Sequence, residues 1–222
     1  MLCPVLWAIQ PATAAAAEVT GKLVMGAYKP PKEPDNPRLR CYWELENGFK
    51  EVVPDRVAPQ RELAVVLLGG AQQKGESSVE VTYSDGSLLP STIVVRPDTT
   101  LRVRNTDEIA HELYAKGLDK FAVEAISPRA IRSVPLKEAG KWPLLDRLIT
   151  HVRGFLHVLE NLVAVAKVAP DGTFAFSEIA PGKYQLKVFH GPYELASKSI
   201  EIGPRDKAEL DPIVLSAPAT TK

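Results

Sequence analysis

The amino-acid sequence predicts an all-β protein, and two observations support this fold class. Helical periodicity is almost absent after the first 17 residues, whereas short segments of alternating apolar and polar residues recur along the chain. Gly, Pro, Asp and Asn separate these segments, as expected for turns between strands. The chain has 222 residues, of which 45% are hydrophobic, so it can form one large β domain or two small ones.

Residues 1–17 are typical of an export signal peptide. The apolar run MLCPVLWAI leads into PATAAAAEVTG, where small residues in the A-x-A pattern predict cleavage after Ala17. No Lys or Arg precedes the apolar run, which a true start upstream of Met1 would explain. The alternative to a signal peptide is a buried N-terminal strand or helix. The run is too short to span a bilayer as a helix. We expect a periplasmic or secreted protein with no transmembrane segment, in which Cys41 is the only thiol left after cleavage.

The alternating segments predict thirteen strands, and turn chemistry separates several of them. The Pro-rich, charged run at residues 28–40 cannot form a central strand, because proline lacks the N–H that a ladder needs. Pro170–Gly172 and Ala180–Tyr184 are turn signals, since Pro presets φ and Gly accepts a positive φ. The expected strands are residues 19–25, 40–45, 63–70, 78–84, 91–97, 100–106, 111–116, 130–136, 154–160, 162–168, 172–178, 182–190 and 194–202.

The charge balance argues against two classes of partner. Lys plus Arg and Asp plus Glu number 27 each, so no overall field attracts nucleic acid or an acidic membrane surface. We therefore expect no nucleic-acid binding. Motifs for catalysis are also missing: the chain has no G-x-S-x-G, no H-E-x-x-H and no Gly-rich phosphate loop before a helix. We expect no enzymatic activity; a hydrolase assembled from unrelated loops is the alternative.

The segment AVAKVAPDGTFAFSEIAPGKYQLKVFHG, residues 164–191, resembles the carboxypeptidase regulatory-like, or prealbumin-like, β-sandwich repeat. That family has a D-G turn, a G-x-F strand, a Pro-Gly turn and a Tyr-containing strand. The matching residues are Asp171, Gly172, Phe174, Phe176, Ile179, Pro181, Gly182, Tyr184 and Leu186. The resemblance implies a β-sandwich and says almost nothing about chemistry.

A second region resembles the cupredoxin-like domain of exported plastocyanin-related proteins. Its first half contains Leu89, Pro90, Ile93, Val95, Asp98, Val103, Asn105, Asp107 and His111 in the family's order, and its second half contains Gly140, Trp142, His151, Gly154 and Val158. The combination of the two families is similar to exported methylamine-utilization-type proteins. It implies a cupredoxin-like Greek-key sandwich plus a prealbumin-like β-sandwich.

Strand counting predicts how these two parts share the chain. The C-terminal repeat alone has too few strands for a closed sandwich, and residues 18–70 contain segments that match the family's opening strands. We expect residues 18–70 and 160–216 to form one sandwich, with a cupredoxin-like domain at 77–159 inserted between them and a tail at 217–222. Contacts of Val65 or Leu67 with Phe174 or Leu186 are expected from this arrangement.

Copper chemistry is where the sequence departs from the cupredoxin pattern. A blue-copper site needs two imidazoles, a thiolate and a weak axial ligand such as Met. Leu148 occupies the position of the Cys, and no Met follows His151. Type 1 copper is therefore not expected. His111 and His151 are the candidate metal ligands, with Asp107, Glu112 or Asp146 completing the shell of a Cu(II) or Zn(II) site.

The sequence therefore predicts an exported, non-enzymatic β-sandwich protein with a degenerate cupredoxin site, which binds or assembles with an unknown protein partner in the cell envelope. Under this interpretation it holds no cofactor, and His111 and His151 are structural. The alternative is a copper-binding or electron-transfer protein that keeps a two-His metal site.

Overall fold

The structure, a computed structural model, describes residues 17–26, 62–69, 78–84, 86–149, 152–204 and 207–216. These residues form sixteen strands and one short 3-10 turn, Asp119–Phe121, and contain no α-helix. The predicted all-β fold is confirmed. The predicted strand at 40–45, the predicted loop at 28–40 and residues 1–16 of the predicted signal peptide lie outside the described residues. Within the described part of the chain, no helix has the length and apolar character needed to cross a membrane.

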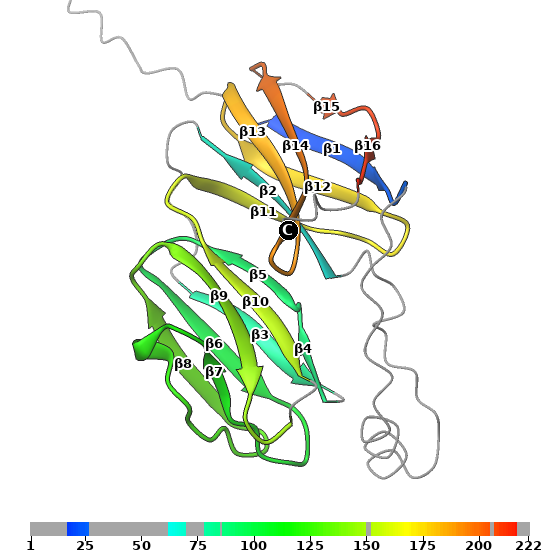
Figure 1. Cartoon of the computed structure of the whole chain (residues 1–222). Helices are drawn as coiled ribbons and strands as arrows, with labels where there is room; N and C mark the ends of the chain where they lie inside the picture. Colours follow the sequence, from blue (N-terminus) through cyan, green and yellow to red (C-terminus); the bar gives the residue numbers. More distant parts are fainter. Residues whose placement is uncertain are drawn as a thin grey trace, which may run out of the picture.

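The strands form two lobes, which Figure 1 shows one above the other. We call the lower one the central lobe, because its strands come from the middle of the chain. It consists of β3 (Ser78–Ser84), β4 (Ser87–Leu89), β5 (Thr92–Val95), β6 (Thr99–Asn105), β7 (Leu113–Ala115), β8 (Ile131–Leu136), β9 (Gly140–Asp146) and β10 (Arg153–Val158). Two four-stranded sheets, in the orders β4-β3-β6-β8 and β5-β10-β9-β7, form this lobe.

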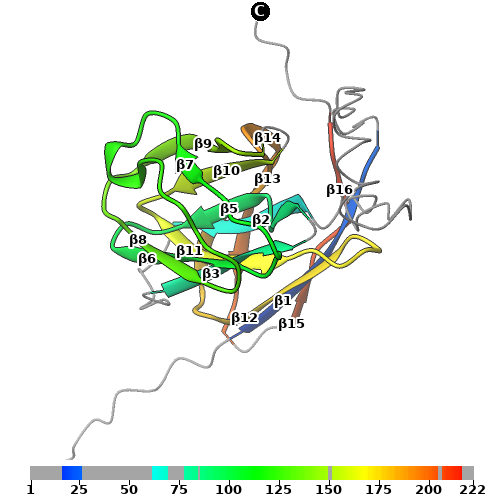
Figure 2. The ribbon, with the colours of Figure 1, turned by 90° about the horizontal axis from the view of Figure 1, so that it is seen from below.

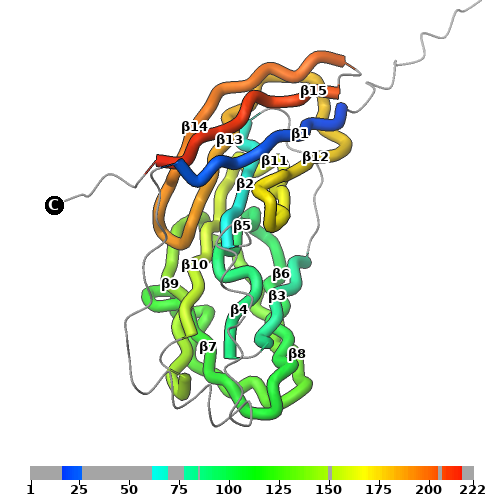
Figure 3. The backbone as a smooth tube through the Cα atoms, turned by 90° about the vertical axis from the view of Figure 1, so that its right-hand side faces the viewer, coloured from blue at the N-terminus to red at the C-terminus, as the bar shows by residue number. Residues whose placement is uncertain are grey.

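The other lobe combines strands from both ends of the chain, and we call it the terminal lobe. Its strands are β1 (Ala17–Val24), β2 (Leu63–Leu68), β11 (Leu162–Lys167), β12 (Thr173–Ile179), β13 (Gly182–His190), β14 (Tyr193–Ile202), β15 (Lys207–Glu209) and β16 (Ile213–Val214). One sheet has the order β12-β1-β15, with β16 also paired to β1, and the other has the order β11-β2-β13-β14. Figure 3 shows β1 and β2 running among the C-terminal strands.

Pairing between distant segments holds the terminal lobe together. β1 pairs antiparallel with β12, and β2 lies between β11 and β13. Leu67 lies directly opposite Leu186 in the β2–β13 ladder. Gly172, directly before β12, has a φ of +87°, and a Cβ there would lie 2.4 Å from the carbonyl oxygen of Leu23. Only glycine fits this close approach of β1 to the turn before β12.

Each lobe has its own buried core, and the burial of the strands follows their alternation. Every second residue of β6 is buried, as expected for a strand with one face toward a core. β2 differs, because five of its six residues are buried, so that both faces of this strand are covered. Val65 and Leu67 belong to the terminal-lobe core. Ala64 and Val66 point the other way and join a third cluster with Val94, Leu162 and Phe189, which lies between the lobes.

Several strands were not predicted from the sequence. β9 is absent from the expected strands although it pairs with both β7 and β10, and Pro143 lies within it. β4, β15 and β16 have only two or three residues each, too few for alternation to show. The predicted strand at 111–116 is shorter in the structure, because β7 covers only Leu113–Ala115 and His111 makes an isolated bridge to Ile126.

Candidate functional site

The central lobe contains a buried histidine whose two ring nitrogens both face carboxylates. His111 has no exposed surface. Its Nδ1 lies 2.9 Å from Oδ2 of Asp146, and its Nε2 lies 3.0 Å from Oδ2 of Asp107. An imidazole with both nitrogens on carboxylate oxygens donates from both only when it is protonated. The arrangement therefore fits an imidazolium held between two aspartates.

Asp146 ends β9 and links this histidine to two other parts of the lobe. Its Oδ1 accepts the backbone N–H groups of Leu148 and Ile149, which fixes the turn that follows the strand. Its Oδ2 accepts the hydroxyl of Tyr83 at 3.1 Å, in addition to the His111 contact. Every interaction of this carboxylate is with a donor, as a buried charge requires.

Tyr83 on β3 covers the imidazole. The two rings are stacked, with centroids 3.9 Å apart and planes inclined by 12°. Tyr83 is itself fully buried. Since β3 and β9 lie in opposite sheets of the central lobe, the Tyr83–Asp146 hydrogen bond and the stack on His111 connect the two sheets.

Asn105 at the end of β6 holds the loop that carries Asp107 and His111. Its side-chain nitrogen donates to the carbonyls of Ile109, Ile126 and Ser127, and its oxygen accepts the backbone N–H of Asp107. Asp107 in turn accepts the N–H of Gly86 from the β3–β4 turn. The Asn-x-Asp pattern in the sequence thus makes a compact loop whose polar groups are satisfied inside the protein.

Electrostatics in this cluster favour the ionised forms of His111 and Asp146. Burial alone would lower the pKa of His111, but the hydrogen bonds to Asp107 and Asp146 outweigh it and raise that pKa. Burial would raise the pKa of Asp146, whereas His111 and the N–H groups of Ile149 and Leu148 lower it overall. Burial, and then the charge of Asp146, raise the pKa of Tyr83 far above its usual range. Tyr83 therefore stays protonated and donates to Asp146.

The other candidate ligands lie elsewhere. Glu112 forms an ion pair with Arg147 rather than facing His111, and His151 lies outside the described residues. Leu148, at the position of the missing Cys, is exposed. Among the residues that the structure describes, no three His, Cys, Asp or Glu side chains are grouped to hold a metal ion. A metal on His111 would have to displace Asp107 or Asp146, because each occupies a ring nitrogen.

Three of the predicted site residues, His111, Asp107 and Asp146, lie together as hydrogen-bond partners. Tyr83 and the supporting role of Asn105 were not predicted. Tyr83 falls on the same face of SVEVTYS as the buried Val81, so its alternation in that strand was an available signal. Nothing in the sequence shows that its hydroxyl meets Asp146, 63 residues away.

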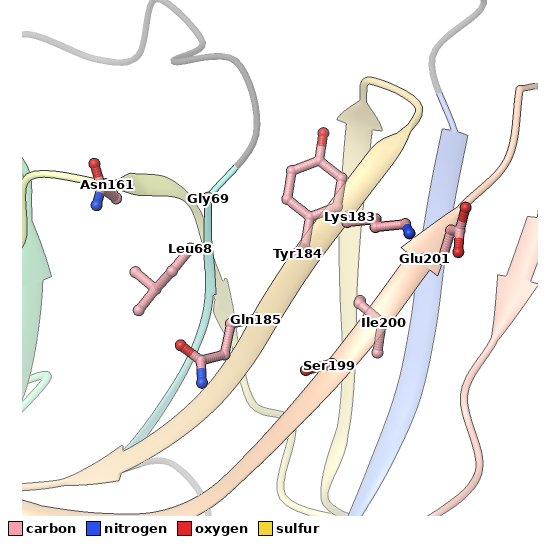
Figure 4. A pocket seen from close by; sticks show the side chains of 9 residues that line it. All are labelled: Leu68, Gly69, Asn161, Lys183, Tyr184, Gln185, Ser199, Ile200 and Glu201. Atoms are coloured by element: carbon pink, nitrogen blue, oxygen red, sulfur yellow. The ribbon is translucent and has the colours of Figure 1, made fainter.

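An open pocket of about 620 Å³ lies in the terminal lobe, and none of the residues of the His111 network lines it. Figure 4 shows it where β13 and β14 extend past the end of β2. It is lined by Leu68, Gly69, Asn161, Lys183, Tyr184, Gln185, Ser199, Ile200 and Glu201. It contains neither His nor Cys, so it offers no soft or imidazole ligand, and its few charged groups belong to Lys183 and Glu201.

Comparison with known proteins finds similarity only at the level of structure. No family model matches the chain, and no curated protein matches it. The chain is similar to a reduced amicyanin mutant (16% identity, 38% of this chain and 85% of that one, TM-score 0.34) and to amicyanin from Paracoccus versutus (14% identity, 42% and 97%, TM-score 0.34). It is also similar to a copper-containing nitrite reductase from Thermus scotoductus SA-01 (14% identity, 41% and 24%, TM-score 0.35).

These neighbours are cupredoxins. The similarity concerns the all-β fold alone. The prealbumin-like character of the terminal lobe stays a prediction.

Proposed function

We propose that this protein is a non-enzymatic β-sandwich protein that binds or assembles with a protein partner in the cell envelope, and that its cupredoxin site has become a structural network. One observation carries the second part of the proposal, the change of the copper site into a structural network. His111, at the position of the first copper ligand in the resemblance, is fully buried and bonded to a carboxylate at each ring nitrogen. The ring thus connects two loops of the protein and leaves neither nitrogen for a ligand.

The chemistry of copper binding supports the same interpretation. A metal takes the lone pair of a neutral imidazole. Here two carboxylates favour the protonated ring, which has no lone pair to offer. Metal binding would require deprotonation of His111 and rotation of a buried aspartate, and the described residues supply no thiolate to offset that cost.

We further propose the domain arrangement expected from the sequence, with residues 18–70 and 160–216 in one domain and 77–159 inserted. The pairing of β1 with β12 and of β2 with β13 supports it, as does the separate core of each lobe. Export by a signal peptide at 1–17 and a periplasmic or secreted location are part of the proposal, which the apolar run and the A-x-A pattern support.

Metal titration tests whether the cupredoxin site has become a structural network. We would titrate Cu(II), and separately Zn(II), by calorimetry into the parent protein and into the His111→Gln and His151→Gln variants. The matched control is His190→Gln, which changes a histidine bound to Glu62 in the terminal lobe. We expect no heat of metal binding that is present in the parent protein and lost in the His111→Gln variant. Micromolar or tighter binding that both His111→Gln and His151→Gln abolish, with circular dichroism unchanged, would instead establish the two-His copper protein.

A further inference from the structure

The turn between β13 and β14 connects the terminal lobe to the central lobe through both polar groups of one residue. The carbonyl of Gly191 accepts a hydrogen bond from Nε2 of His157 on β10, at 2.7 Å. The N–H of Gly191 donates to Oγ1 of Thr92 on β5, at 2.8 Å. Figure 2 shows the ends of β13 and β14 beside β9 and β10. We call this contact the lobe joint.

His157 is buried in an apolar setting at this joint. It has no exposed surface, and its ring lies between Phe189 and Phe155, with centroid distances of 4.6 Å and 4.9 Å. A carbonyl only accepts, so Nε2 must carry the hydrogen and Nδ1 of the neutral ring is bare. Nδ1 has no hydrogen-bond partner among the residues that the structure describes. Protonation would create a buried N–H donor with no acceptor, which is costly.

The charges near His157 also oppose protonation. Lys141 on β9 lies directly opposite His157 in the ladder, and its ammonium lies 5.8 Å from the centre of the Phe189 ring. β5 presents Thr92 and Val94, which carry no charge. Beside the turn, His190 is bonded to Glu62 at 2.9 Å.

One ion pair joins β13 and β14 near this turn. Glu194 on β14 pairs with Lys187 at 2.9 Å. Burial, and then Lys141, lower the pKa of His157 although the Gly191 carbonyl acts against them. Among the described residues, the charged group that acts on this ring is therefore the ammonium of Lys141, and no carboxylate faces it.

We propose that His157 makes the lobe joint sensitive to acid, such that its protonation releases the β13–β14 turn from the central lobe. The released state lets the charged ring reach water, whereas the joined state keeps it neutral. Joining is then complete above the ordinary pKa of histidine, near 6.5, and weakens as the pH falls below it. A protein that meets mildly acidic surroundings would loosen one defined contact while both cores stay intact.

Hydrogen exchange of the Gly191 amide measures the joint, because that amide donates to Thr92 across it. We would follow its protection factor in the full chain from about pH 7.5 to about pH 5, corrected for the intrinsic exchange rate, with Leu101 and Leu186 as core amides of the two lobes. One proton linked to opening changes the protection by at most about tenfold per pH unit. We expect Gly191 to lose protection with acid while Leu101 and Leu186 keep theirs.

The decisive variant is His157→Gln, whose carboxamide can donate to the Gly191 carbonyl but does not titrate. It should keep Gly191 protected at both ends of the pH range, whereas the control His190→Gln should keep the wild-type loss. A Gly191 amide that loses protection equally in His157→Gln would overturn the proposal. If His157→Gln does not fold, ¹⁵N NMR of the wild-type ring decides: a His157 that stays neutral while Gly191 loses protection also overturns it.

Discussion

Tyr83 and His111 stack almost parallel in the centre of the central lobe, with ring centroids 3.9 Å apart, and both contact Asp146. The aromatic ring, the imidazole and the carboxylate come from three separate segments of the chain. The stack orients the imidazole, and the hydroxyl of Tyr83 supplies a second donor to the carboxylate that His111 uses. This relationship makes the network testable one side chain at a time.

Removal of Asp146 should be the most damaging change in the network. Asp146→Ala leaves a buried imidazolium with one partner and frees the N–H groups of Leu148 and Ile149. Breaking a buried charge pair costs about 3–5 kcal/mol. Urea denaturation at neutral pH measures the loss. Glu112→Ala, which removes an ion pair with the exposed Arg147, is the control and should cost less than about 1 kcal/mol; equal losses would contradict the central role of Asp146.

Tyr83→Phe separates the hydroxyl from the ring. The variant keeps the stack on His111 and removes only the hydrogen bond to Asp146. We expect a loss of about 1.5–3 kcal/mol in the free energy of unfolding, since a hydrogen bond to a charged acceptor disappears. Tyr83→Ala also removes the ring and should cost about 3–5 kcal/mol. Similar losses for both variants would mean that the stack contributes little.

Asn105→Ala should destabilise the loop that carries Asp107 and His111. The change removes one side-chain amide that serves three carbonyls and the N–H of Asp107. Each buried group left without a partner costs about 1–3 kcal/mol. Asn105→Asp should be worse, because it places a carboxylate against those carbonyls. A thermal unfolding series checks the order, and an Asn105→Asp variant as stable as the wild type would show that the loop rearranges.

The network should also shape the pH dependence of stability. The pKa of His111 is raised, so its contribution is complete below the ordinary value of 6.5 and is lost as the pH rises through the raised value. The pKa of Asp146 is lowered, so its contribution is present above 3.8 and is lost as the pH falls through the lowered value.

The difference in unfolding free energy between wild type and His111→Gln isolates the histidine, because effects of other groups such as His157 cancel. We expect this difference to shrink between about pH 6 and about pH 9. Urea titrations at the two pH values measure it. A difference that stays constant or grows with pH would show that His111 is neutral in the folded protein.

Gly172→Ala tests the joining of the two chain ends. Its Cβ would collide with the Leu23 carbonyl, and φ at this position is +87°. We expect a loss of about 1–3 kcal/mol in stability. The loss should appear as faster amide exchange in β1 and β12. The control Gly191→Ala shares a positive φ, but its Cβ would meet no atom of the described residues within 4 Å, so it should cost less.

The sequence predicted much of the fold because alternation is a local signal. The strands around Val103 and Tyr184 could be read from their own residues, as could the turn at Gly172. It predicted the site less completely. Asp107 lies four residues from His111 and shares its loop, so the pair is visible in the sequence, whereas the approach of Asp146 and Tyr83 depends on how two sheets pack. The hydrogen bond of His157 Nε2 depends on a turn 34 residues away and has no sequence signature.

β2 carries a final consequence for how the protein unfolds. Its six residues contribute to the terminal-lobe core on one face and to the cluster between the lobes on the other. A strand shared in this way couples the melting of its neighbours, since either lobe can lose its packing only by exposing part of the same apolar surface. Heat should therefore unfold both lobes in one cooperative transition, although each has its own core.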